Sequence, residues 1–134
     1  MQDNELIKQA SKARTSAYAP YSKFAVGAAL LTRTGKVFAG CKVENVSLGL
    51  TICAERAALA AAIAQGCRDF EAIAVVTDSS RPAFPCGACR QVLAEFNPKM
   101  KVVAANAAGE IERSSLNELL PVPTQGLLSK SKDV

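Results

Sequence analysis

Two short cysteine motifs constrain this chain more than any other feature of its sequence. The first is Cys53-x-Glu55 and the second is Cys86-x-x-Cys89. A Cys-x-x-Cys pair at the start of a helix brings two sulfur atoms within reach of one tetrahedral metal ion. The helix dipole and the free N–H groups of the first turn favour thiolates at that place. Cys53 begins another predicted helix, so we expect the fold to bring two helix N-termini to one ion.

The sequence contains no histidine, which excludes zinc sets with imidazole ligands, Ser-His and Cys-His nucleophile pairs, and an imidazole general base. Three thiolates leave the fourth position of a tetrahedral ion open, which is typical of a catalytic zinc rather than a structural one. Glu55 follows Cys53 so closely that its carboxylate lies near the metal without being a ligand. It can therefore move protons between water and a substrate. The sequence predicts Cys53, Cys86 and Cys89 as zinc ligands and Glu55 as the proton shuttle.

Three plainer interpretations of these cysteines remain open. Free cysteines are often ordinary buried side chains of a hydrophobic core. A purely structural zinc needs a fourth ligand, which Cys41 or Cys67 could supply. A small zinc-stapled interaction module would likewise have a closed site with four ligands and no turnover.

The hydrophobic pattern predicts an α/β fold. Residues 4–18, 53–65 and 86–96 have the periodicity or composition of helices, and Ser115 with Glu118 resembles a capping box that starts a last short helix. Strands are expected at residues 26–32, 36–41, 72–77, 102–105 and 111–113, the first two joined as a hairpin. Because strands and helices alternate after residue 50, some strand pairs should be parallel. We predict three layers, with a mixed five-stranded sheet between helices on both faces.

Size and charge favour a small-molecule substrate. The chain has 134 residues, enough for one domain over residues 1–134, and its tail from about residue 122 is expected to be mobile. The net charge of +4 comes from scattered lysines and arginines, and aromatic residues make up only 5%. A nucleic-acid surface requires a basic stripe or interleaved stacking aromatics, so no nucleic-acid partner is expected.

Neither a membrane span nor a secretory signal is predicted. The apolar runs at residues 25–31 and 57–64 are far shorter than the ~20 residues that a membrane helix needs. Residues 1–12 are polar and charged and lack the apolar segment of a signal peptide. We therefore expect a cytoplasmic protein, in which thiols stay reduced and cysteine clusters bind metal or act in catalysis.

Several stretches occur in the order and spacing of a known family, over nearly the whole chain. They are residues 18–24 (YAPYSKF), 26–30 (VGAAL), 43–45 (VEN), 50–56 (LTICAER), 85–91 (PCGACRQ) and 119–121 (LLP). In these stretches the chain resembles the short, homotetrameric type of cytidine deaminase, within the cytidine and deoxycytidylate deaminase superfamily. Zinc deaminases have this type of signature, with three cysteines as one variant of the ligand set and a glutamate as general acid and base.

The resemblance implies a reaction, a cofactor and an assembly. The reaction is the hydrolytic deamination of cytidine and 2′-deoxycytidine to the uridine products and ammonia, by a zinc-activated hydroxide with Glu55 as proton shuttle, in pyrimidine salvage. The cofactor is one Zn²⁺ per subunit, and the assembly is a homotetramer with sites at subunit interfaces.

The resemblance also implies roles for individual residues. Phe24 would pack against the nucleoside, and Glu44 would accept a hydrogen bond from a ribose hydroxyl. Backbone groups of Ala54 and Phe84 would meet the pyrimidine edge and the leaving amino group. Three thiolates around Zn²⁺ leave a net charge of −1, which Arg56 would offset by donating to them, with Gln91 beside it.

The chain departs from the family pattern in the part that would bind the sugar. Lys42 stands where the family usually has an asparagine that contacts the ribose; lysine can still donate a hydrogen bond, but with a charge and a different reach. Leu48 replaces a common tyrosine, and residues 121–126 (PVPTQG) lack the aromatic that usually reaches a neighbouring subunit's site. These departures leave open another cytosine-bearing substrate, such as an antibiotic nucleoside of the blasticidin S type. A nucleic-acid editing deaminase is the other alternative.

Overall fold

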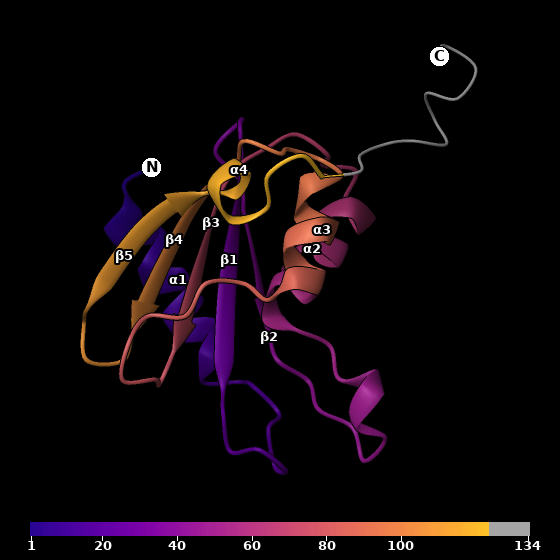
Figure 1. The fold of residues 1–134 in the computed structure, drawn as a ribbon, viewed down its shortest axis with the longest axis vertical. Coiled ribbons are helices and arrows are strands. Elements are labelled where there is room, and N and C mark those ends of the chain that lie inside the picture. Colours follow the sequence, from indigo (N-terminus) through magenta and orange to yellow (C-terminus); the bar gives the residue numbers. More distant parts are fainter. Residues whose placement is uncertain (124–134) are drawn as a thin grey trace.

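The computed structural model describes residues 1–123, and the tail predicted to be mobile lies outside the described residues from position 124 onward. Its elements are α1 (Asp3–Arg14), β1 (Val26–Thr32), β2 (Val37–Cys41), the short 3₁₀ helix η1 (Leu48–Leu50), α2 (Ala54–Ala64), β3 (Phe70–Thr77), α3 (Gly87–Ala94), β4 (Lys101–Asn106), β5 (Ile111–Ser115) and α4 (Leu116–Leu119). Figure 1 shows one sheet with helices packed around it.

The sheet is mixed and has five strands in the order β2-β1-β3-β4-β5. β3 and β4 are parallel and are joined by the crossover through α3. The other neighbouring pairs are antiparallel. The prediction of a mixed five-stranded sheet with partly parallel pairing is confirmed.

Both faces of the sheet are covered, as strand β1 illustrates. Ala28 and Leu30 belong to the core beneath α2 and α3, whereas Ala29 and Leu31 belong to the core beneath α1. Successive side chains of a strand point to opposite faces, so a strand buried on both faces reads as a continuous apolar run. Figure 1 shows α1 across the sheet from α2 and α3, which confirms the predicted three-layer α/β fold.

Two glycines let helices approach the sheet closely. A Cβ atom at Gly27 of β1 would lie 2.1 Å from the backbone oxygen of Ala10 in α1. A Cβ atom at Gly40 of β2 would lie 2.4 Å from the backbone nitrogen of Ala58 in α2. Both separations are far shorter than a van der Waals contact. These positions therefore require glycine if the helices are to pack this closely on the sheet.

The predicted first helix, residues 4–18, is too long at its C-terminal end. α1 stops at Arg14, and the chain then turns so that the Tyr18 N–H donates to the Lys42 carbonyl at 2.8 Å. The Glu44 N–H donates to the Tyr18 carbonyl at 2.8 Å. These long-range hydrogen bonds outweigh the helical pattern of residues 15–18, and they bring that segment beside the chain that follows β2.

The predicted capping box at the last helix is wrong in its contacts. Ser115 precedes α4, but its side chain makes no capping hydrogen bond. The hydroxyl of Ser114 donates to the Glu118 carboxylate instead, at 3.3 Å. The short helix itself is present. Within the described residues, no helix is both long and apolar enough to cross a membrane.

Candidate metal centre and active site

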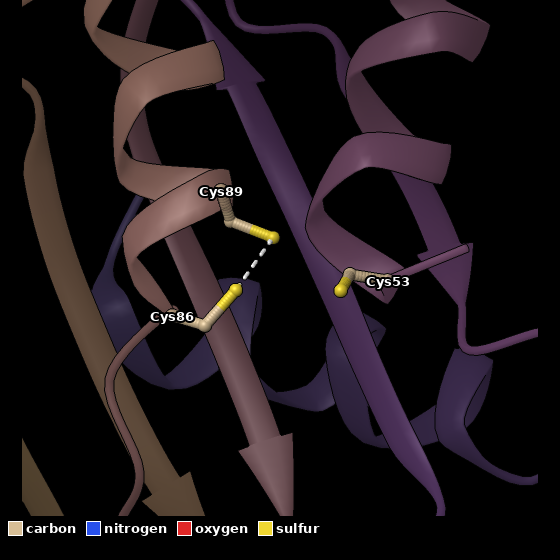
Figure 2. Close-up of side chains that lie close together, drawn as sticks. All are labelled: Cys53, Cys86 and Cys89. Atoms are coloured by element: carbon tan, nitrogen blue, oxygen red, sulfur yellow. Dashed lines mark hydrogen bonds between the residues drawn. The ribbon is translucent and has the colours of Figure 1, made fainter. Parts of the chain in front are cut away.

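Three thiols converge where the N-termini of α2 and α3 meet. Cys53 and Cys86 are the residues that immediately precede the two helices, and Cys89 lies in the first turn of α3. Their three Sγ atoms all lie within 4.8 Å of one another. Figure 2 shows the three side chains pointing into the same space from the two helices. The structure therefore brings the two cysteine motifs together as their sequence positions predict.

The spacing of the sulfur atoms fits a tetrahedral metal site. A Zn–S bond of ~2.3 Å places two sulfurs of a regular tetrahedron about 3.8 Å apart. The Sγ atoms of Cys86 and Cys89 are 3.7 Å apart. Soft thiolates in this geometry suit zinc. Among the cysteine, histidine and acidic side chains of residues 1–123, this is the group that could hold a metal, and neither Cys41 nor Cys67 belongs to it. The interpretation as a closed site with one of them as fourth ligand therefore has no support.

Arg56 lies directly beside the thiols. Its Nη2 atom donates a hydrogen bond to the Cys53 sulfur at 3.1 Å. This hydrogen bond raises the pKa of the Arg56 guanidinium above its ordinary value, and the charge attraction to Cys53 and Cys89 acts in the same direction. The guanidinium therefore stays positive and offsets part of the negative charge that three thiolates bring together.

The thiols of Cys86 and Cys89, at the start of α3, differ in how readily they ionise. Burial raises the pKa of the Cys89 thiol, and the nearby Glu55 carboxylate adds to the increase. Partial burial opposes ionisation of Cys86 as well, but hydrogen bonding with the backbone and side chain of Cys89 outweighs it and lowers the pKa of Cys86. Cys86, which is exposed, is therefore the more readily ionised thiol of the two.

Glu55 is a buried carboxyl group in the first turn of α2. Its residue is only 5% exposed, and burial raises the pKa of the carboxyl above its ordinary value. A carboxyl group with a raised pKa holds and releases a proton more readily near neutral pH than an exposed one. Glu55 and two of the three cysteines, Cys53 and Cys86, line the same cavity.

The cavity is formed by residues that lie far apart in the sequence. Its volume is about 190 Å³. Its lining consists mostly of apolar side chains around a few polar groups: Phe24, Val26, Lys42, Cys53, Ala54, Glu55, Val75, Thr77, Ala83, Phe84 and Cys86. Small-molecule sites typically combine an apolar wall with a few convergent polar groups. All but two of the predicted catalytic, metal and substrate positions line the cavity; these two are Cys89, which belongs to the thiol cluster, and Glu44.

Glu44 lies just outside the lining and is tied to it through Lys42. The Glu44 residue is 6% exposed, and its Oε2 atom lies 3.0 Å from the Lys42 ammonium. The Ser22 hydroxyl donates to Oε2, and the backbone N–H groups of Tyr21 and Ser22 donate to Oε1 at 3.0 and 3.2 Å. The Ser22 hydrogen bond is the largest cause that lowers the pKa of Glu44, to about 2. Glu44 is therefore ionised near neutral pH.

The other predicted residues occupy distinct places. Ala54 is buried at the start of α2, and Phe84 lies in the segment between β3 and α3, both on the cavity wall. Gln91 lies on α3 two residues after Cys89 and is exposed.

Two residues that hold the site together were not predicted from the sequence. Ser22, in the stretch of residues 18–24, donates hydrogen bonds to the Glu44 carboxylate. Arg90 donates from Nε to the Pro85 carbonyl at 2.6 Å and from Nη1 to the Leu119 carbonyl at 2.8 Å. Arg90 thereby ties the turn before Cys86 to α4. The sequence feature that could have indicated this role is the position of Arg90 directly after the second cysteine motif.

The fold and the cluster define a class of protein: a three-layer α/β domain with a metal-binding thiol group at two helix N-termini. Residues 1–105 match the family described as the cytidine and deoxycytidylate deaminase zinc-binding region. The chain therefore belongs to this family of zinc-binding deaminases, which confirms the resemblance seen in the sequence.

Individual relatives span nearly the full chain. It is 56% identical to a cytidine deaminase of Halalkalibacterium halodurans over 117 residues, which cover 87% of this chain and 89% of that protein. The crystal structure of cytidine deaminase from Burkholderia pseudomallei superposes with a TM-score of 0.90 at 52% identity, covering 92% of this chain and 100% of that one. A blasticidin-S deaminase of Bacillus cereus is more distant, at 31% identity over 90% of this chain and 91% of that protein.

Proposed function

We propose that this protein catalyses the hydrolytic deamination of cytidine and 2′-deoxycytidine to uridine and 2′-deoxyuridine plus ammonia, a reaction of pyrimidine salvage. The observation that carries the proposal is a cluster of three thiols, two of which line the same cavity as a buried carboxyl group, Glu55. The identity of 56% and 50% to proteins named cytidine deaminase supports cytidine as the substrate.

Cys53, Cys86 and Cys89 would hold the zinc ion, one per subunit. Zinc in a site of this kind lowers the pKa of a water molecule so that it becomes a nucleophile near neutral pH. Glu55 takes a proton from the attacking water and delivers it to N3 of the pyrimidine. It then moves a proton to the exocyclic amino group as the C4–N4 bond breaks. Water adds one oxygen at C4, ammonia leaves, and the uracil product results.

The remaining substrate contacts are those that the family resemblance implies, and Phe24, Lys42, Ala54 and Phe84 line the cavity. Phe24 packs against the nucleoside, and Glu44 accepts a hydrogen bond from a ribose hydroxyl, with Lys42 beside both at the sugar end. The backbone of Ala54 and Phe84 meets the pyrimidine edge and the leaving amino group. Arg56 moderates the charge of the thiolates through its hydrogen bond to Cys53, and Gln91 assists from α3.

The 134-residue chain is proposed to act as one domain in a cytoplasmic homotetramer. Large apolar side chains are exposed along the segment between β2 and α2 and at Tyr18, which is joined to that segment by hydrogen bonds. They are Tyr18 (55% exposed), Val43 (42%), Val46 (78%), Leu48 (68%), Leu50 (66%) and Ile52 (47%). Exposed apolar groups gathered in this way are typical of an interface. Light scattering should give four chains per particle, and a monomer would contradict the assembly.

A substrate panel tests the proposed reaction. Zinc-loaded protein is incubated with cytidine, 2′-deoxycytidine, cytosine and blasticidin S, and product formation is followed by ultraviolet absorbance. We expect efficient turnover of the first two compounds only. Preferential turnover of blasticidin S would show that the substrate is an antibiotic nucleoside of that type rather than cytidine. Binding of single-stranded oligonucleotides at low salt would instead favour a nucleic-acid editing role.

A further inference from the structure

The Lys42 ammonium group is fully engaged by acceptors of the protein itself. Its Nζ atom lies 3.0 Å from Glu44 Oε2, 3.2 Å from Ser22 Oγ and 3.2 Å from the Phe24 carbonyl oxygen. A lysine has three N–H donors, and three acceptors are in place. The Lys42 side chain is only 17% exposed, so water competes little for these bonds. Lys42 therefore has no free donor for a sugar hydroxyl.

All three acceptors are connected with the loop of residues 21–24. Ser22 and Phe24 belong to this loop, and Glu44 binds its backbone N–H groups. The Ser22 hydroxyl also accepts a hydrogen bond from the Phe24 N–H at 3.0 Å. Lys23, in the middle of this loop, has a φ of +61°, a left-handed conformation that is unfavourable for a non-glycine residue. Strained backbone persists only where the surrounding structure enforces it. Lys42 and Glu44, in the segment that follows β2, hold this loop in place through their hydrogen bonds.

Phe24 is the residue that this loop delivers to the cavity. The Lys42 Nζ atom lies 5.3 Å from the centre of the Phe24 ring, within the range of a cation–π contact. The carbonyl of Phe24 is bound by the same ammonium group, so Lys42 fixes both the backbone and the ring of this residue.

We propose that Lys42 is a positioning residue, which determines nucleoside affinity by anchoring the 21–24 loop and the Phe24 ring rather than by donating a hydrogen bond to the sugar. The inference deepens the proposed function, since it rests on Phe24 as a nucleoside contact. An uncharged amide at position 42 has only two N–H donors, so it could not satisfy the three acceptors on Glu44, Ser22 and Phe24 at once.

The first test measures the loop without any substrate. Lys42→Met keeps the length of the side chain and its packing on Phe24 but removes the charge and the donors. Hydrogen exchange of the backbone amides in residues 19–25, followed by mass spectrometry on the full-length protein, should become faster in Lys42→Met. The exposed Lys99 provides the matched control, and Lys99→Met should leave this exchange unchanged. Unchanged exchange in Lys42→Met would overturn the anchoring role, whether or not cytidine is the substrate.

The second test separates positioning from direct contact. We expect Lys42→Met to raise KM roughly tenfold, the size of a lost charged hydrogen bond, with kcat within about twofold. The same loss should be found with cytidine, 2′-deoxycytidine and 3′-deoxycytidine. A loss that disappears for one of the deoxy compounds would show that Lys42 acts at the sugar, directly or through Glu44, and would overturn the inference.

A double-mutant cycle tests whether Lys42 acts through Phe24. Phe24→Ala should raise KM by itself, and adding Lys42→Met in that background should cost less than about twofold more, because both changes remove the same contact. Fully additive effects would contradict an action through Phe24. An unchanged KM in Phe24→Ala would remove the proposed nucleoside contact and the inference with it. Absence of turnover in the wild type would contradict the proposed reaction alone, because the hydrogen-exchange result does not depend on it.

Discussion

At the scale of single residues, burial and charge divide the acidic groups around the site into two kinds. Glu55 is buried, and burial raises its pKa more than the nearby positive charge of Arg56 lowers it. Glu44 is equally buried but surrounded by donors, and its pKa is lowered to about 2. Proton transfer needs a carboxyl group that changes state, whereas binding a hydroxyl needs one that does not. The two environments therefore match the two roles proposed for these residues.

Replacement of Glu55 by glutamine removes the titrating group and keeps the shape of the side chain. We expect Glu55→Gln to retain zinc and to lose roughly 100- to 10,000-fold in kcat, the usual contribution of a general acid and base. Metal analysis and the rate of cytidine turnover measure the two effects. The exposed Glu71 on β3 serves as control, since Glu71→Gln should be fully active. Normal turnover by Glu55→Gln would rule out the proton shuttle.

The low pKa of Glu44 predicts a pH-dependent contribution to stability. A carboxyl group with a folded-state pKa of about 2 and an ordinary value of 4.5 stabilises the fold fully above pH 4.5. This contribution is lost as the pH falls from 4.5 towards 2. Wild type should therefore be more stable than Glu44→Gln at pH 7, and the difference should shrink by pH 3.

Urea unfolding of both proteins at pH 7 and pH 3 measures this change. Loss of zinc at acid pH affects both proteins alike, so their difference isolates Glu44. A difference that stays constant between the two pH values would contradict the low pKa.

At the scale of elements, much of the fold was predictable because the hydrophobic residues of most helices and strands follow a local pattern, either a helical period or a continuous apolar run. The strands at residues 26–32 and 102–105 read as apolar runs, and they lie in β1 and β4. The end of α1 was not predictable, since the hydrogen bonds that stop it join Tyr18 to the chain at 42–44, far along the sequence. The contacts of Ser22 and Arg90 were hidden for the same reason.

The segment between β3 and α3, which carries Ala83 and Phe84, depends on one buried side chain of β4. Asn106 is 4% exposed, and its Nδ2 atom lies 3.1 Å from the Ser79 carbonyl oxygen and 2.9 Å from Glu110 Oε1. The Glu110 N–H donates to Asn106 Oδ1 at 2.9 Å. This side chain joins the β4–β5 turn to the start of the segment that carries Ala83 and Phe84.

Removal of the Asn106 amide should loosen that wall. We expect Asn106→Ala to lower the free energy of unfolding by about 1–3 kcal/mol, because buried polar partners lose their hydrogen bonds. KM for cytidine should rise while zinc content stays normal. Thermal unfolding, metal analysis and steady-state kinetics test this, with the exposed Asn117→Ala in α4 as control. Unchanged stability and KM would show that the cavity wall does not need this residue.

At the scale of the whole molecule, the thiol cluster connects the starts of two helices that lie far apart in the sequence and pack on the same core. Cys53 precedes α2, and Cys86 and Cys89 belong to the start of α3 after the intervening strand β3. The grouping of the three cysteines was predictable from motif spacing. The orientation of the two helix N-termini was not, because it depends on how both helices pack on the same face of the sheet.

Loss of zinc should therefore weaken the whole fold. A bound ion that prefers the folded state adds to stability by mass action. We expect a chelator, or Cys86→Ala, to lower the unfolding temperature and to remove the metal. Cys67→Ala, at a half-buried cysteine outside the cluster, is the matched control and should retain zinc. Unchanged zinc content in Cys86→Ala would count against the ligand set.

The most direct test of the central claim follows cytidine by ultraviolet absorbance in three samples of the same protein. One sample is loaded with zinc, one is stripped by a chelator, and one is stripped and then reloaded. We predict conversion to uridine in the loaded and reloaded samples and none in the stripped sample. Cytidine that stays unchanged with folded, zinc-loaded protein, or turnover that persists after complete removal of zinc, would contradict a zinc-dependent cytidine deaminase.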